Sequence, residues 1–156
     1  MGKQRERELT AYCGLYCGDC IRYRSRAADL ARDLLSELQD TEFDKYAEAK
    51  RLSRDKAEEL EHYQECCEVL TAMVRLQCNE SCRVASGCPT FSCKIVECCQ
   101  KKGFEGCWQC GEFENCREFE SLRPFHGDVP IMNLEKIGEL GLDNWVEYRQ
   151  KFYIWQ

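Results

Sequence analysis

Cysteine is the residue type whose number and spacing most directly imply chemistry in this sequence. Fourteen of the 156 residues are cysteines, and nine of them lie between Cys78 and Cys116. Cys107 and Cys110 have two residues between them and a glycine on either side, the spacing of a knuckle in which both thiolates reach one metal ion. Neighbouring short helices would supply further ligands. The sequence therefore predicts a four-thiolate site with one cysteine to spare, drawn from Cys93, Cys98, Cys107, Cys110 and Cys116.

A second motif near the start of the chain carries three more thiols. Cys13, Cys17 and Cys20 fall within eight residues, and a helix that begins at Asp19 or Cys20 would lower a thiol pKa through its dipole. A fourth ligand must come from elsewhere, and an antiparallel helical hairpin between the two cysteine regions would return the chain to this motif. We therefore expect a second centre, with candidate ligands Cys13, Cys17, Cys20, Cys78 and Cys82.

Zinc fits both sets of thiols, as one or two Zn²⁺ ions per chain, because four thiolates bind it tetrahedrally without redox chemistry. The chain is short of other means to hold its loops, since only about 35% of it is hydrophobic once cysteine is set aside. Structural zinc contributes about 10–16 kcal/mol to the folding of small zinc-binding peptides. We therefore expect zinc to stabilise a binding or scaffold module.

Two other chemistries stay open for these thiols. The spacing of Cys13, Cys17 and Cys20 also suits a [4Fe-4S] cluster in an electron-transfer protein, because cysteines in short loops hold iron clusters as readily as zinc. Thiol exchange or metal transfer is the other chemistry. The surplus thiols that would serve it are Cys88, Cys98 and Cys99. Phosphate-binding loops, nucleophile elbows and paired-histidine motifs are absent from the sequence, which therefore favours a protein that is not an enzyme.

Charge and hydropathy limit the partners and the compartment. The net charge of −6, from 22 basic and 28 acidic residues, argues against binding to nucleic acid or to an anionic membrane. No stretch approaches the ~20 apolar residues of a membrane span, and the charged start MGKQRERELTAY is not followed by an apolar run. We expect a cytoplasmic protein with reduced thiols and an unknown protein partner. The sequence leaves the oligomeric state open.

A single metal-binding domain over 1–156, mainly α-helical with little or no strand, would position these cysteines. A helical hairpin insert follows from two patterns. Apolar residues recur at three and four positions through Ala27, Leu30, Ala31, Leu34, Leu35 and Leu38. A second helical stretch follows Thr41, and Asp55 with Glu58 has the form of a capping box that opens a further helix with Cys67 on its apolar face. The expected segments are an N-terminal Cys motif 1–21, the insert 22–77, a Cys-rich knuckle region 78–122 and C-terminal helices 123–156.

Shorter elements are expected after the insert. Glycines and prolines favour short helices around 94–102 and 112–122, a connecting loop at 123–130, and a helix that Gly141 ends. A closing helix from about Asp143 would pack on the long helices of the insert through Trp145, Val146, Phe152 and Tyr153. Neither His62 nor His126 lies at a sequence distance from a cysteine that is typical of metal ligands. His126 is the one to test as a substitute ligand.

Three runs of the sequence carry a resemblance to a known family. AYCGLYCGDC, CKIVECCQKKGFEGCWQCGEFENC and NLEKIGELGLDNW resemble the uncharacterised prokaryotic proteins grouped as domain of unknown function 3795, which are described as zinc-binding or cysteine-rich cytoplasmic proteins. The likeness spans nearly the whole chain and implies no activity. It implies metal-binding roles for Cys13, Cys17, Cys20, Cys93, Cys98, Cys107, Cys110 and Cys116.

Overall fold

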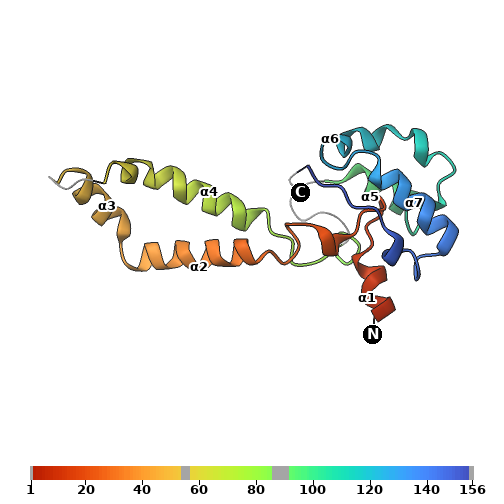
Figure 1. The fold of residues 1–156 in the computed structure, drawn as a ribbon, viewed down its shortest axis with the longest axis horizontal. Coiled ribbons are helices and arrows are strands. Elements are labelled where there is room, and N and C mark those ends of the chain that lie inside the picture. The colour runs from red at the N-terminus through yellow and green to blue at the C-terminus, as the bar shows by residue number, and fades with distance from the viewer. Residues whose placement is uncertain (1, 54–56, 86–91, 155–156) are drawn as a thin grey trace. The chain divides into compact units, whose positions relative to one another are not determined.

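The computed structural model describes residues 2–53, 57–85 and 92–154, and these residues are mainly α-helical, as predicted (Figure 1). The chain divides into two compact units. The cysteine unit comprises Met1–Tyr23 and Asn79–Gln156, and the hairpin unit comprises Arg24–Cys78. The hairpin unit nearly coincides with the predicted insert 22–77, and the single-domain organisation stays a prediction. None of the helices in the described ranges is long and apolar enough to cross a membrane.

The hairpin unit consists of α2 (Arg26–Asp40), α3 (Phe43–Arg51) and α4 (Tyr63–Arg75), with a 3-10 helix at Glu58–His62 before α4. The Ser25 hydroxyl caps α2 by accepting from Ala28 N. At the open end of the hairpin, Arg24 N donates to Cys78 O at 2.8 Å, and Gln77 Nε2 donates to Ser25 O at 3.1 Å. These bonds hold the two ends of the unit together. Asp55 of the predicted capping box lies outside the described residues.

The contact between α2 and α4, which lie side by side in Figure 1, is narrower than the predicted apolar face. Ala28 and Ala31 are buried, whereas Leu30 and Leu34 are 51% and 46% exposed. We call the residues that face one another the seam. They are Ala28, Ala31, Leu35 and Leu38 of α2, and Tyr63, Cys67, Leu70 and Val74 of α4. The prediction of one apolar face on α2 was therefore too broad, because only half of its members lie in the seam.

The cysteine unit is built from α1 (Gly2–Leu9), α5 (Lys94–Lys102), α6 (Arg123–His126) and α7 (Val129–Leu140). Helix α5 has the predicted bounds, and Gly141 follows the end of α7 as predicted. Side chains from distant parts of the chain meet in one core, which contains Ile95, Cys99, Cys107, Phe119, Leu134, Ile137, Leu142, Trp145 and Val146. The cysteine-rich region thus contributes to a core that α7 and the C-terminal segment complete.

Three predictions for the C-terminal third were wrong. The helix expected at 112–122 is a pair of 3-10 helices, Phe113–Asn115 and Arg117–Ser121. The expected loop 123–130 contains α6 and the start of α7, because each of its prolines occupies a first helical turn, where a missing N–H costs nothing. The expected closing helix is one short 3-10 helix, Val146–Tyr148, and Trp145 and Val146 belong to the core of the cysteine unit instead of packing on the long helices.

Candidate metal centres

The N-terminal cysteine motif forms a tight turn against α7. Gly14 has a φ of +82°, and a Cβ there would lie 2.7 Å from Pro130 O and 2.9 Å from Leu134 Cγ. Only glycine combines this backbone conformation with so close an approach. The turn holds Cys13 against the core, while Cys17 begins a 3-10 helix. Gly14 therefore fixes where the first two thiols of the motif lie.

Cys82 lies beside Cys17. Arg83 Nε donates to Thr10 O at 2.9 Å, so the stretch that contains Cys82 is fastened to the N-terminal segment. A hydrogen bond between the two thiols raises the pKa of Cys17 and lowers that of Cys82 to about 7. Cys82 is therefore the member of the pair that loses its proton first, and a deprotonated thiol is the form that binds metal.

Two further thiols complete this arrangement. Burial, with a smaller contribution from neighbouring Cys82, raises the pKa of Cys13 to about 12, and Cys93 acts on Cys13 in the same direction. We call Cys13, Cys17, Cys82 and Cys93 the first thiol group. The pKa values of Cys13 and Cys17 are raised, and a cation among the four thiols would lower them, because an opposite charge favours the thiolate. The group therefore has the chemistry that a metal ion requires.

A second group surrounds a cavity of about 420 Å³. Helix α5 places Cys99 against Cys107, with 3.5 Å between the two sulfur atoms. The hydrogen bond between them lowers the pKa of Cys99 and raises that of Cys107. We call the cysteines that line the cavity the second thiol group. They are Cys98, Cys99, Cys107, Cys110 and Cys116.

The predicted knuckle is formed by a 3-10 helix at Cys107–Gln109. Cys110 N donates to Cys107 O at 2.9 Å, which closes the turn. A Cβ on Gly106 would lie 2.0 Å from the Trp108 ring, so glycine is required there for space. Cys107 N donates to Tyr12 O at 2.9 Å and so ties the knuckle to the N-terminal motif. The two thiol groups are thus joined through the backbone.

Arg83 lies between the two thiol groups. Its guanidinium stacks over the rings of Tyr12 and Trp108, with 4.8 Å and 5.4 Å to the ring centroids. Its charge lowers the pKa of both Cys82 and Cys99, one from each group, although a hydrogen bond to a second thiol lowers each of them more. Among the described residues, its Nη2 is buried without a hydrogen-bond partner. A buried N–H of this kind is costly unless it donates to an anion that the site receives.

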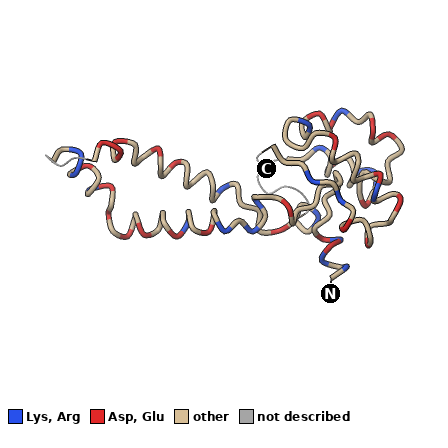
Figure 2. The backbone as a smooth tube through the Cα atoms, in the orientation of Figure 1, with Lys and Arg blue, Asp and Glu red and all other residues tan. Residues whose placement is uncertain are grey.

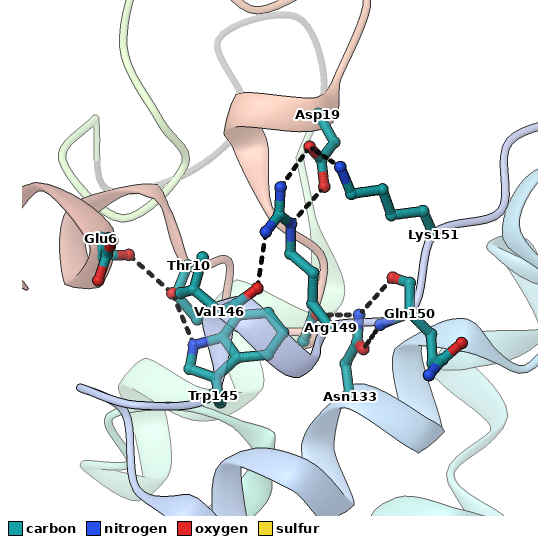
Figure 3. Close-up of polar contacts among 10 residues, drawn as sticks. Glu6, Thr10, Asp19, Asn133, Trp145, Val146, Arg149, Gln150 and Lys151 are labelled. Carbon is teal, nitrogen blue, oxygen red and sulfur yellow. Dashed lines mark hydrogen bonds and ion pairs between the residues drawn. The ribbon is translucent and has the colours of Figure 1, made fainter.

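A polar network fixes the N-terminal motif to the C-terminal segment (Figure 3). Arg149 donates to both carboxylate oxygens of Asp19, at 2.6 Å and 2.9 Å, and Lys151 Nζ lies 3.2 Å away. Burial alone would raise the pKa of Asp19, but these two partners lower it. Asn133 Nδ2 donates to Gly14 O at 2.9 Å and joins the same turn to α7. Both ends of the motif are therefore anchored.

Asp19→Asn is expected to destabilise the protein by about 1–3 kcal/mol, because an amide leaves Arg149 without its anionic partner in a half-buried place. Asp128→Asn is the matched control. Asp128 also pairs with an arginine but is 71% exposed, so its change is expected to cost less than about 0.5 kcal/mol. Urea unfolding of both variants measures the difference. Equal losses would show that the Asp19 pair is no more important than a surface ion pair.

The ligand roles of Cys20 and Cys78, and the substitute role of His126, stay predictions. Cys20 follows the 3-10 helix at Cys17–Asp19 and is half-buried. Cys78 ends the hairpin unit. His126 Nδ1 lies 3.3 Å from Phe152 O, and its ring meets Tyr153 edge-on, so it contacts the C-terminal segment. Cys88, a candidate for thiol exchange, lies outside the described residues.

Sequence reasoning did not include Cys99 among the ligands and assigned Cys93 to the knuckle. Cys99 follows the buried Ile95 by four residues on α5, and this helical spacing could have placed it on the inner face. In the ranges 2–53, 57–85 and 92–154, no group of three or more His, Cys, Asp or Glu side chains is arranged so that it could hold a metal ion without further movement. Side-chain rotations would have to bring the gathered thiols onto an ion.

Comparison with known proteins gives one match. The model of a family described as Protein of unknown function (DUF3795) matches residues 9–121. That range includes the whole hairpin unit and every member of both thiol groups. No curated protein and no solved structure matches the chain.

Proposed function

We infer that this chain, which belongs to the DUF3795 family, is a zinc-binding protein in which two thiolate centres hold the cysteine unit together. The observation that carries the proposal is a cavity lined by five cysteines. The charge of Arg83 lowers the pKa of one thiol at this cavity, Cys99, and of one thiol in the first thiol group, Cys82. Fourteen cysteines in 156 residues suit metal ligands in the reducing cytoplasm, where we place the protein.

The role of the metal is structural. From Cys107 to Ser121 the chain forms only 3-10 helices of three to five residues, and 3-10 turns of this length have weak hydrogen-bond geometry. The buried hydrophobic side chains of this stretch are those of Cys107 and Phe119 alone. Zinc bound by the second thiol group would fasten this stretch to α5. The metal would thus leave the outer surface of the unit available for a protein partner.

Charge balance supports the same proposal. Four thiolates and one Zn²⁺ carry a net charge of about −2, which needs nearby cations in a partly buried site. Arg83 supplies one between the two groups. Lys102 Nζ lies 4.0 Å from Cys110 Sγ at the second group and supplies another. Each centre therefore has basic groups that would favour the deprotonated ligands.

The test is elemental analysis and native mass spectrometry of protein purified without oxygen. We expect about two zinc ions per chain, a colourless solution, and a large drop in melting temperature when a chelator removes the metal. A bare polypeptide mass, together with melting that a chelator does not change, would overturn the proposal.

An iron–sulfur cluster is the second candidate. The observation in its favour is the cavity volume of about 420 Å³, which exceeds the space that one ion needs. Thiolates in short loops bind such clusters as well as zinc. A brown protein that absorbs at about 400 nm and contains iron and acid-labile sulfide would support this candidate against zinc.

A further inference from the structure

The hairpin unit has an apolar face that its own fold does not cover. Its buried side chains, within the residues that the structure describes, are Ala28, Ala31, Ala47 and Gln77. Five larger apolar side chains of α2 and α4 are 37% to 61% exposed, and we call them the outer patch. They are Leu30, Leu34, Val69, Met73 and Leu76. Exposed apolar side chains that gather on two adjacent helices are typical of an interaction surface.

All five side chains lie on the same side of the hairpin. Four of them stand directly before a member of the seam in the sequence. The fifth, Leu76, stands directly before the buried Gln77. Successive residues of a helix are turned by about 100°, and α2 and α4 run in opposite directions. Positions just before the seam on the two helices therefore point to the same side. The outer patch is one continuous surface.

The opposite side of the hairpin has a different composition. The residue that comes directly after each seam residue points to that side, and every one of these residues is polar. They are Asp29, Arg32, Ser36 and Gln39 on α2, and Gln64, Glu68, Thr71 and Arg75 on α4. The hairpin is therefore amphipathic across its thickness, which is the pattern of a helix pair that is half of a larger bundle.

We propose that the outer patch binds the same patch of a second copy of this chain, turned end for end, to form a four-helix bundle. A two-fold axis near residue 32 of α2 places Leu30 opposite Leu34 of the second copy. The same axis passes near residue 71 of α4 and places Val69 opposite Met73 of the second copy. The spacing of these four side chains, Leu76 set apart, is thus the same when read from either end, as an isologous interface requires.

The charges of the hairpin favour this orientation. On the side of the outer patch, α2 carries the basic Arg26 at its start and the acidic Glu37 near its end, and acidic residues predominate along the rest of both helices (Figure 2). End-for-end stacking places Arg26 opposite Glu37 of the second copy, so that opposite charges meet at both ends of the paired α2 helices. Charges at the edge of an interface set its orientation more than its strength.

The first test measures association of the full chain by sedimentation velocity, in reductant, over a wide range of concentration. We expect a reversible dimer of twice the 18.3 kDa chain mass. Leu34→Glu is expected to weaken the dimer roughly 100-fold, because the change buries a carboxylate twice in each interface. Ser36→Glu, on the polar side of the same helix, is the control and is expected to change nothing. Circular dichroism checks that both variants keep their helices.

The second test concerns the orientation. Arg26→Glu and Glu37→Arg are each expected to weaken the dimer by roughly 10-fold at low salt, and the double variant is expected to restore it. A monomer at every concentration would overturn the proposal and leave the patch to another partner or to the cysteine unit. A dimer that Leu34→Glu leaves intact, or that the double variant fails to restore, would overturn it as well.

Discussion

Cys107→Ser is expected to abolish metal binding at the second thiol group and to unfold the segment that contains it. Cys107 is buried in the core, contacts Cys99 and lies at the cavity that four other cysteines line. Hydroxyl oxygen is a poor replacement for thiolate sulfur at zinc. Because structural zinc contributes about 10–16 kcal/mol in small peptides and a domain is stable by about 5–15 kcal/mol, the loss is comparable with the whole stability of the unit.

The matched control for this variant is Cys66→Ser. Cys66 is exposed on α4, in the other compact unit, and its substitution is expected to change stability by less than about 0.5 kcal/mol. Thermal melting and zinc content are measured for both variants with metal in excess. Equal losses of stability would show that structural cysteines and surface cysteines have been confused. A Cys107→Ser protein with full zinc content would contradict the assignment of Cys107 as a ligand.

Arg83→Gln is expected to weaken zinc binding at both thiol groups by about 10- to 100-fold. This range is typical for residues that interact with the metal ligands but do not bind the metal themselves. Gln keeps hydrogen-bonding capacity but removes the cation that favours the thiolates of Cys82 and Cys99. No single cysteine substitution is expected to affect both centres equally. Competition with a zinc-binding dye, titrated to two ions per chain, separates the two affinities.

Two variants show whether the charge of Arg83 or its packing matters. Arg83→Lys keeps the charge while it loses the planar contact with Tyr12 and Trp108, so it is expected to retain most of the affinity. Arg117→Gln removes an exposed cation from the same unit and is expected to leave affinity unchanged. If Arg83→Lys is as weak as Arg83→Gln, the stacking contact rather than the charge supports the centres.

Elements with explicit boundary residues were predictable from the sequence. Gly103, whose φ of +65° suits glycine, directly follows the last residue of helix α5, and this signal gave the correct bounds. The segments around Phe113 and Phe119 gave no such signal, because isolated aromatic residues near cysteines fit a regular helix and a 3-10 helix equally. Pro124 and Pro130 were interpreted as loop residues, although proline is also common in the first turn of a helix.

The sequence predicted two groups of cysteines, but it could not predict which group each cysteine joins. Spacing along the chain identified Cys107 and Cys110, which are local neighbours. Whether Cys93 joins the first or the second group depends on the path of the chain around the core, and no local pattern records that path. Arg83 could not be found either, because its importance comes from a position between two groups that only the tertiary structure creates. The family resemblance inferred from the motifs is confirmed over residues 9–121.

The two ends of the hairpin unit lie close together, where Arg24 N donates to Cys78 O, and this has an evolutionary consequence. The 53 residues between Arg24 and Cys78 begin and end at nearly the same point. A short turn could therefore replace these residues without changing the path of the chain before Arg24 or after Cys78. We therefore expect this arm to tolerate changes in its length while the cysteines stay unchanged. The arm can thus evolve as an interchangeable module.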